Sequence, residues 1–298
     1  MRLCYSFFVR QTSDIPIPDE QRWAVLQRKA QEVRAVDAFG LLRSHGIEPI
    51  LIKGLAAAYS YPPDRLRMSV DMDLAVSSKN YQEAKRVCSL PEFAGLAVDL
   101  HNELRHLDTV NWEDLYSNSI TVEVDGTALR FLRPEDHLRV LCLHWLTDGG
   151  ANKERLWDIY YIVAGRKPEF DWSRFFDPVS PRRQEWLRCT LGLADRYLAL
   201  DLSGTPAADA GKCLPKWLIR AVEKEWANDM PVIPLGACLN DRKLLLKQIR
   251  RRLPPNPVQA TIDMEGAFDA RSRFFYQIAS AFKRARHASR MSPQPANS

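Results

Sequence analysis

Apolar residues recur along the first part of the chain with two different periods. From residue 19 to 45 they stand three or four positions apart, which predicts an amphipathic helix, with Trp23, Leu26, Ala30, Val33 and Val36 on its apolar face. Shorter runs that are β-branched or alternate apolar with polar residues predict strands at 48–53, 71–77 and 96–101, and a hairpin of 120–124 and 128–132. Short helices are expected at 55–60 and 80–87.

The pattern changes after Arg133. Pro134 is followed by two acidic residues, as is typical of a first helical turn. Helical spacing then continues almost to the end of the chain, at 134–147, 153–165, 182–200, 215–227, 240–252 and 268–288. The sequence therefore predicts an α+β protein: a small sheet-containing domain with an N-terminal helix over residues 1–133, followed by a helical domain over 134–298 with basic C-terminal helices.

Composition adds a question about partners. Hydrophobic residues make up 46% of the 298 residues, enough for packed cores, and the net charge is +5. Residues 240–298 contain twelve Lys or Arg against four Asp or Glu, so the rest of the chain is slightly acidic. Two basic clusters, at 250–252 and 283–286, would suit contact with a polyanion such as nucleic acid. Basic helix ends are more often a solvated surface that complements helix C-terminal dipoles, and both readings stay open.

Cysteine usage and hydropathy bear on location. The six cysteines are scattered, with no CxxC pair and no zinc-like spacing, which favours a reducing compartment. No apolar run is long enough to span a bilayer. We expect a cytoplasmic protein without membrane contact.

The candidate chemistry lies around the predicted strand at 71–77. Asp71 and Asp73 alternate with apolar Met72 and Leu74, so both carboxylates are expected on one face of the strand. Two anions at that spacing repel unless a cation lies between them, and a divalent metal is the usual partner. Lys53 and Gly54 come at the end of the preceding strand. This combination suggests Mg²⁺ (or Mn²⁺) carrying a nucleoside triphosphate.

A third carboxylate strengthens the prediction. Asp99 lies in a similar apolar strand, LAVDLH, which places Asp99 and His101 on one face. Three carboxylates on adjacent strands can hold two Mg²⁺ ions that neutralise a triphosphate and stabilise leaving pyrophosphate. Other common catalytic motifs (the G-x-S-x-G elbow, the Walker loop and H-E-x-x-H) do not occur in the sequence.

These motifs resemble a known family. In order they are KGLAAAYSYP, R-x-x-x-D-x-D-L-x-V, V-D-L-H, P-E-D-H-L-x-x-L-C-x-H and L-x-D-I, spread over roughly residues 20–200. Together they resemble the uncharacterised bacterial nucleotidyltransferase-like family of the polymerase-β-type nucleotidyltransferase superfamily. The resemblance implies a small mixed-sheet nucleotidyltransferase domain followed by helices. It also implies transfer of an NMP group from an NTP to a hydroxyl acceptor, with release of pyrophosphate.

The resemblance assigns roles to individual residues. It makes Asp71, Asp73 and Asp99 the metal-binding and catalytic carboxylates, with Asp99 as the general base. It places Lys53 and Gly54 in the phosphate-side loop. It implies that Arg67 binds a phosphate or stabilises that loop. ATP is the expected nucleotide.

Alternatives remain at the level of sequence. Leu55 stands where the superfamily usually has serine after the loop glycine, which favours a degenerate nucleotide-binding regulatory protein. A toxin-like transferase that acts on RNA or protein, docking through the basic C-terminal helices, is the other alternative. The acceptor is therefore open between a small molecule, a peptide or protein, and RNA.

Overall fold

The computed structural model describes residues 19–67, 69, 71–104, 108–228, 230 and 232–291, so residues 1–18 of the predicted first domain lie outside the described residues. The chain packs into two compact units. The first extends to Leu141 and adds Tyr161–Pro178, and the second consists of Cys142–Tyr160 and the residues from Val179 onward. The domain boundary predicted at residues 133/134 stays a prediction.

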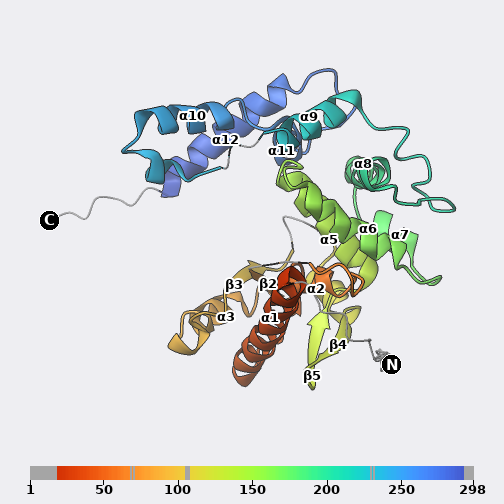
Figure 1. Ribbon diagram of the computed structural model, residues 1–298, viewed down its shortest axis with the longest axis vertical. Helices are drawn as coiled ribbons and strands as arrows, with labels where there is room; N and C mark the ends of the chain where they lie inside the picture. Colours follow the sequence, from red (N-terminus) through yellow and green to blue (C-terminus); the bar gives the residue numbers. More distant parts are fainter. Residues whose placement is uncertain are drawn as a thin grey trace. The chain divides into compact units, whose positions relative to one another are not determined.

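A mixed five-stranded sheet forms the centre of the first unit, and it confirms the predicted α+β class (Figure 1). The strands lie in the order β3-β2-β1-β5-β4. Two neighbouring pairs, β2 with β3 and β1 with β5, are parallel, while β1/β2 and β4/β5 are antiparallel. The strand bounds are β1 Ile50–Leu51, β2 Met72–Val76, β3 Val98–Asn102, β4 Ile120–Val124 and β5 Thr127–Phe131.

Alternating side chains give this sheet two buried faces. On one face Leu51 and Leu74 join a core with Phe39 and Leu42 of α1, the long helix that leads into the sheet. On the other face Ile52 and neighbouring apolar residues join a smaller core under helices α4 and α5. The helices of this unit are α1 Asp19–Ser44, α2 Leu55–Ala58, α3 Tyr81–Val87, α4 Trp112–Ser117, the first part of α5 Pro134–Thr147, and α7 Trp172–Phe176.

The second unit is helical, as predicted. Its core contains Trp186 and Phe268, and the indole nitrogens of Trp186 and Trp217 donate hydrogen bonds to the carbonyls of Gly266 and Phe268. The periodic pattern located the three helices predicted at 182–200, 215–227 and 240–252 to within two residues, began the last helix six residues too early, and missed the helix Pro257–Asp263. The helices are α6 Leu156–Ala164 (shared with the first unit), α8 Pro181–Leu198, α9 Lys216–Trp226, α10 Arg242–Arg252, α11 Pro257–Asp263 and α12 Phe274–Met291.

Two further predictions can be compared with the structure. The five cysteines among the described residues are all free thiols. None of the helices that the structure describes is both long and apolar enough to cross a membrane.

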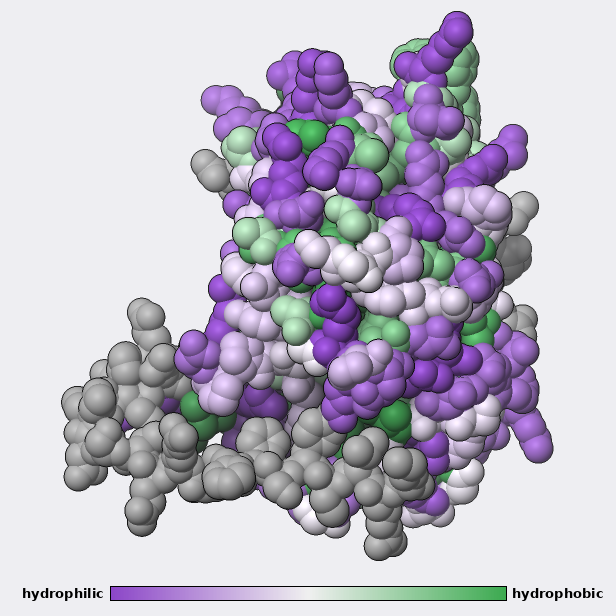
Figure 2. All heavy atoms as spheres, turned by 90° about the vertical axis from the view of Figure 1, so that its right-hand side faces the viewer, coloured by the Kyte–Doolittle hydropathy of each residue, from purple (hydrophilic) through white to green (hydrophobic). Residues whose placement is uncertain are grey.

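On the face of the molecule shown in Figure 2, hydrophobic side chains reach the surface in small patches among hydrophilic ones.

A buried cluster of charges ties the elements of the first unit together. Arg139 of α5 is fully buried, and its guanidinium Nη2 lies 2.8 Å from Asp108 Oδ2 and 2.6 Å from Asp136 Oδ1. Its Nη1 donates to the carbonyl of Arg174 in α7. Arg174 in turn pairs with Asp136 and with Asp114 of α4. The cluster thus links α4, α5, α7 and the segment before α4.

Removal of the Arg139 guanidinium should lower the stability of the first unit. We expect Arg139→Met to lower the free energy of unfolding by about 3–5 kcal/mol, because Asp108 and Asp136 would keep buried charges without their partner. Urea unfolding followed by circular dichroism measures the change. The matched control is Arg86→Met, which breaks an exposed pair with Glu83 and should leave the urea midpoint nearly unchanged. Equal midpoints for both variants would contradict the structural role of Arg139.

Candidate active site

The pairing of β2 with β3 brings two predicted site residues together. The strands are parallel and in register, so that Asp73 lies directly opposite Asp99, and Ala75 opposite His101. Residues opposite one another in neighbouring strands point to the same face of the sheet. The side chains of Asp73, Asp99 and His101 therefore stand together where β2 and β3 begin.

Lys53 reaches the same place from β1. Because β1 runs antiparallel to β2, its carboxyl end lies beside the start of β2, and the amide of Ile52 donates to the Asp73 carbonyl at 3.1 Å. Lys53 follows Ile52, and its Nζ lies 2.7 Å from Asp73 Oδ1. The ammonium is buried, so this ion pair is shielded from water.

His101 bridges the two carboxylates. Its Nε2 lies 3.1 Å from Asp73 Oδ1 and 3.2 Å from Asp99 Oδ2. Both partners are carboxylate oxygens that accept hydrogen bonds, which favours the tautomer with the proton on Nε2. The sequence predicted only that His101 shares one face of its strand with Asp99. The two-residue spacing from Asp99 was the available signal, and the strand order supplied the rest.

The two carboxylates stand in different environments. Only 14% of the Asp73 side chain is exposed, against 62% of that of Asp99. Burial raises the pKa of Asp73, but the hydrogen bond from His101 and the charge of Lys53 outweigh it, and the pKa lies below its ordinary value. Asp73 is therefore a fixed, ionised anion at neutral pH, while Asp99 is open to solvent.

The donor set suits a divalent cation. Among the described residues, one ligand atom each from Asp73, Asp99 and His101 lie within 4.8 Å of one another. Carboxylate oxygens are the ligands that Mg²⁺ and Mn²⁺ prefer, and an ion approaching from solvent would meet Asp99 first. The residues present therefore fit such a metal.

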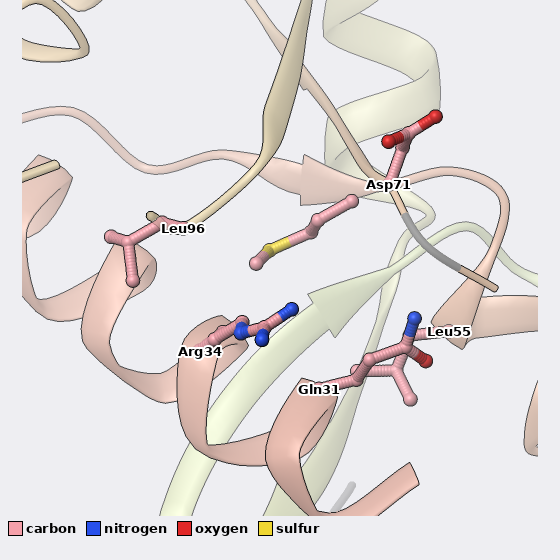
Figure 3. A pocket seen from close by; sticks show the side chains of 6 residues that line it. Gln31, Arg34, Leu55, Asp71 and Leu96 are labelled. Atoms are coloured by element: carbon pink, nitrogen blue, oxygen red, sulfur yellow. The ribbon is translucent and has the colours of Figure 1, made fainter. Parts of the chain in front are cut away.

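Asp71 is not part of this three-residue group. It stands directly before strand β2, which begins at Met72, and its predicted place beside Asp73 stays a prediction. Asp71 is exposed at the rim of a small hollow that is lined by Gln31, Arg34, Leu55, Asp71, Met72 and Leu96. Figure 3 shows its carboxylate turned away from Gln31 and Arg34.

Arg67 and Gly54 occupy the loops beside the site. Arg67 is half-buried in the segment between α2 and β2. Gly54 has a positive φ of 53° directly before α2. A Cβ atom there would approach the Asp71 carbonyl and the Ser69 hydroxyl oxygen to 3.0 Å each. The glycine thus allows the chain after Lys53 to pass close to the start of β2.

Comparison with protein families adds an independent line of support. Residues 91–199 match the model of the uncharacterised nucleotidyltransferase family. This match confirms the resemblance to a nucleotidyltransferase-like family. It includes Asp99, His101 and the buried Arg139, whereas Lys53, Asp71 and Asp73 precede the matched residues. No curated protein and no solved structure matches the chain.

The close approach at Gly54 can be tested by adding one methyl group. We expect Gly54→Ala to cost about 1–3 kcal/mol of unfolding free energy, because the new Cβ combines an unfavourable positive φ with crowding by Ser69 and Asp71. Gly46→Ala is the control, since Gly46 also has a positive φ (73°) but nothing lies within 4 Å of its added Cβ. Thermal unfolding of both variants measures the costs. A Gly54 variant no less stable than the Gly46 variant would contradict the crowding.

Proposed function

We propose that this protein is a metal-dependent nucleotidyltransferase that moves an NMP group from an NTP to a hydroxyl acceptor and releases pyrophosphate. The observation that carries the proposal is the in-register placement of Asp73 and Asp99 on neighbouring strands. A buried lysine lies beside them, in a chain that matches a nucleotidyltransferase family model. The roles of individual residues below are part of the proposal.

Asp73 and Asp99 would hold Mg²⁺ or Mn²⁺. Asp71, which is exposed directly before β2, is assigned to the same metal site by the family resemblance. A bound metal would neutralise triphosphate charge and stabilise the leaving pyrophosphate. The residues of the chain provide position and charge, and no covalent enzyme intermediate is required.

Asp99 is the proposed general base. Its exposed carboxylate accepts the proton of the acceptor hydroxyl as that oxygen forms a bond to the α-phosphorus, and the bond from the α-phosphorus to pyrophosphate breaks. His101, which contacts Asp99 Oδ2, orients this carboxylate. Asp73 is less suited to this role because its pKa is depressed and its Oδ1 already accepts two contacts.

The triphosphate would lie beside the loop after β1. Lys53 supplies positive charge, Gly54 allows phosphate oxygens to approach the backbone, and Arg67 balances further charge. ATP is the proposed nucleotide. Cytoplasmic location stays a prediction from cysteine usage.

The proposal predicts that label from an NTP will reach an acceptor only when the carboxylates are intact. With α-³²P-labelled NTPs, Mg²⁺ or Mn²⁺ and host cell extract, the wild-type protein should release pyrophosphate and label a protein, an RNA or a small molecule. Asp73→Asn and the double variant Asp71→Asn/Asp73→Asn should lower the rate at least ~10³-fold, because charge stabilisation is lost at the reacting phosphate.

Asp64→Asn, a change of an exposed loop carboxylate, is the matched control and should retain full activity. The assay also separates the proposal from its main alternative, a degenerate regulatory protein. Metal-dependent nucleotide binding without transfer from any NTP would favour that alternative. Transfer that persists in the Asp73 variant would contradict the assigned site.

A second observation favours RNA among the acceptor classes. Helix α12 exposes three phenylalanines, Phe274, Phe275 and Phe282, whose side chains are 60%, 74% and 65% accessible. The exposed residues Lys283 and Arg284 follow Phe282 on the same helix, where Lys283 Nζ donates to the Asp263 carbonyl at 3.0 Å and Arg284 Nη2 lies 2.7 Å from Asp263 Oδ2. Exposed aromatic rings suit single-stranded nucleic acid because bases stack on them, and the two basic side chains would exchange Asp263 for phosphates. We therefore propose that α12 contacts an RNA acceptor.

This surface makes a binding prediction that is independent of catalysis. Affinity for a fluorescent single-stranded RNA should fall steeply with salt, and Phe275→Ala/Phe282→Ala should weaken it about tenfold or more through lost stacking. Leu239→Ala removes an equally exposed apolar side chain outside α12 and should leave the affinity unchanged. Fluorescence anisotropy at several salt concentrations measures both effects. Binding that is absent, or that is the same in both variants, would exclude α12 as the RNA contact.

A further inference from the structure

The proposed metal site already contains a cation that belongs to the chain. Lys53 Nζ lies 2.7 Å from Asp73 Oδ1, and His101 Nε2 approaches the same oxygen to 3.1 Å. The side chains of Lys53, Asp73 and His101 are only 9%, 14% and 12% exposed. One carboxylate oxygen thus meets two donors in a nearly dry environment.

The contacts of Lys53 and His101 with Asp73 Oδ1 exclude a metal ion from that oxygen. A carboxylate oxygen offers about two lone-pair positions, and Lys53 and His101 occupy both on Asp73 Oδ1. A divalent ion beside Asp73 would also lie within a few ångströms of the Lys53 ammonium, and repulsion between two cations is strong where water is scarce. The other carboxylate oxygen, Oδ2, is not engaged by these two contacts, so it is the charge of Lys53 that opposes a metal there, and metal binding at Asp73 is favoured when Lys53 moves away.

The Lys53 ammonium needs another anion as its partner before it can move away from Asp73. Its ammonium is buried, so departure without a new partner would leave a desolvated charge unpaired. A triphosphate in the proposed position, next to Gly54, supplies such a partner and brings its own metal. Lys53 would then exchange a carboxylate for a phosphate.

We propose that Lys53 is an internal counter-ion that keeps divalent metal away from Asp73 in the nucleotide-free protein and releases the site when a triphosphate binds. The inference rests on the proposed function, since it assigns the metal to Asp73. Metal and triphosphate then bind cooperatively, and each raises the affinity for the other.

Mn²⁺ binding tests the inference without reference to activity. Electron paramagnetic resonance counts free Mn²⁺, and water-proton relaxation enhancement reports Mn²⁺ held by the slowly tumbling protein. In the absence of nucleotide, Lys53→Met should bind Mn²⁺ at least about tenfold more tightly than the wild type, because a competing positive charge is gone. Lys53→Arg keeps that charge and should stay close to the wild type. Lys79→Met removes an exposed lysine and is the matched control.

Addition of α,β-methylene-ATP, which cannot be turned over at the α-phosphorus, completes the test. The wild type should show relaxation enhancement only with the analogue present, whereas Lys53→Met should show it with Mn²⁺ alone. Asp73→Asn in the Lys53→Met background should abolish that enhancement and so place the ion at Asp73. Circular dichroism confirms that each variant is folded.

Two outcomes would overturn the inference. One is Mn²⁺ affinity in folded Lys53→Met that is no tighter than in the wild type. The other is tight Mn²⁺ binding by the nucleotide-free wild type that depends on Asp73. Neither outcome would remove nucleotidyl transfer, which the labelling assay measures separately. Failure of that assay, with the Mn²⁺ pattern intact, would leave the role of Lys53 standing and refute only turnover.

Discussion

A guanidinium without access to water organises the first unit. Arg139 can remain charged in the interior only because Asp108 and Asp136 pair with it on either side, and each of these contacts fixes a different part of the chain. The neighbouring Val140 packs against the sheet face that carries Ile52 and Ala75. Since Asp73 stands on that same face, the packing of α5 against the face that carries the site depends on a charge cluster that takes no part in the proposed chemistry.

Two similar side chains of the site, Asp73 and Asp99, have different surroundings. Asp73 is enclosed and held by Lys53 and His101, whereas Asp99, one strand away, is largely open. Register alone puts them side by side, and the difference in burial gives them different tasks. The enclosed carboxylate keeps a fixed charge and geometry, while the open one can meet an acceptor and exchange a proton. Similar side chains thus acquire distinct environments through their position in one sheet, which is the basis of the different roles proposed for them.

Periodicity in the sequence predicted the strands and the longer helices because each depends on local spacing. It missed α4, α7 and α11, which have only five to seven residues and so show less than two turns of pattern. It located Lys53, Asp73 and Asp99, but their contacts depend on strand order, which local spacing does not encode. Asp71 was expected in the same strand as Asp73, whereas β2 begins at Met72, one residue later. The buried role of Arg139 was also beyond reach, since an arginine in a helix ordinarily indicates a surface position.

The sheet order leaves one strand edge whose side chains bear on association with other strands. In the sheet of the described residues, β3 is an edge strand, so one row of its backbone groups has no neighbouring strand. Such edges invite pairing with strands of other molecules, and charged side chains along them discourage it. Asp99 is a largely exposed charge on this edge, and Asn102 and His101 add further polarity. The carboxylate proposed to draw a proton from an acceptor is therefore also a charge of the kind that discourages strand pairing along an open sheet edge.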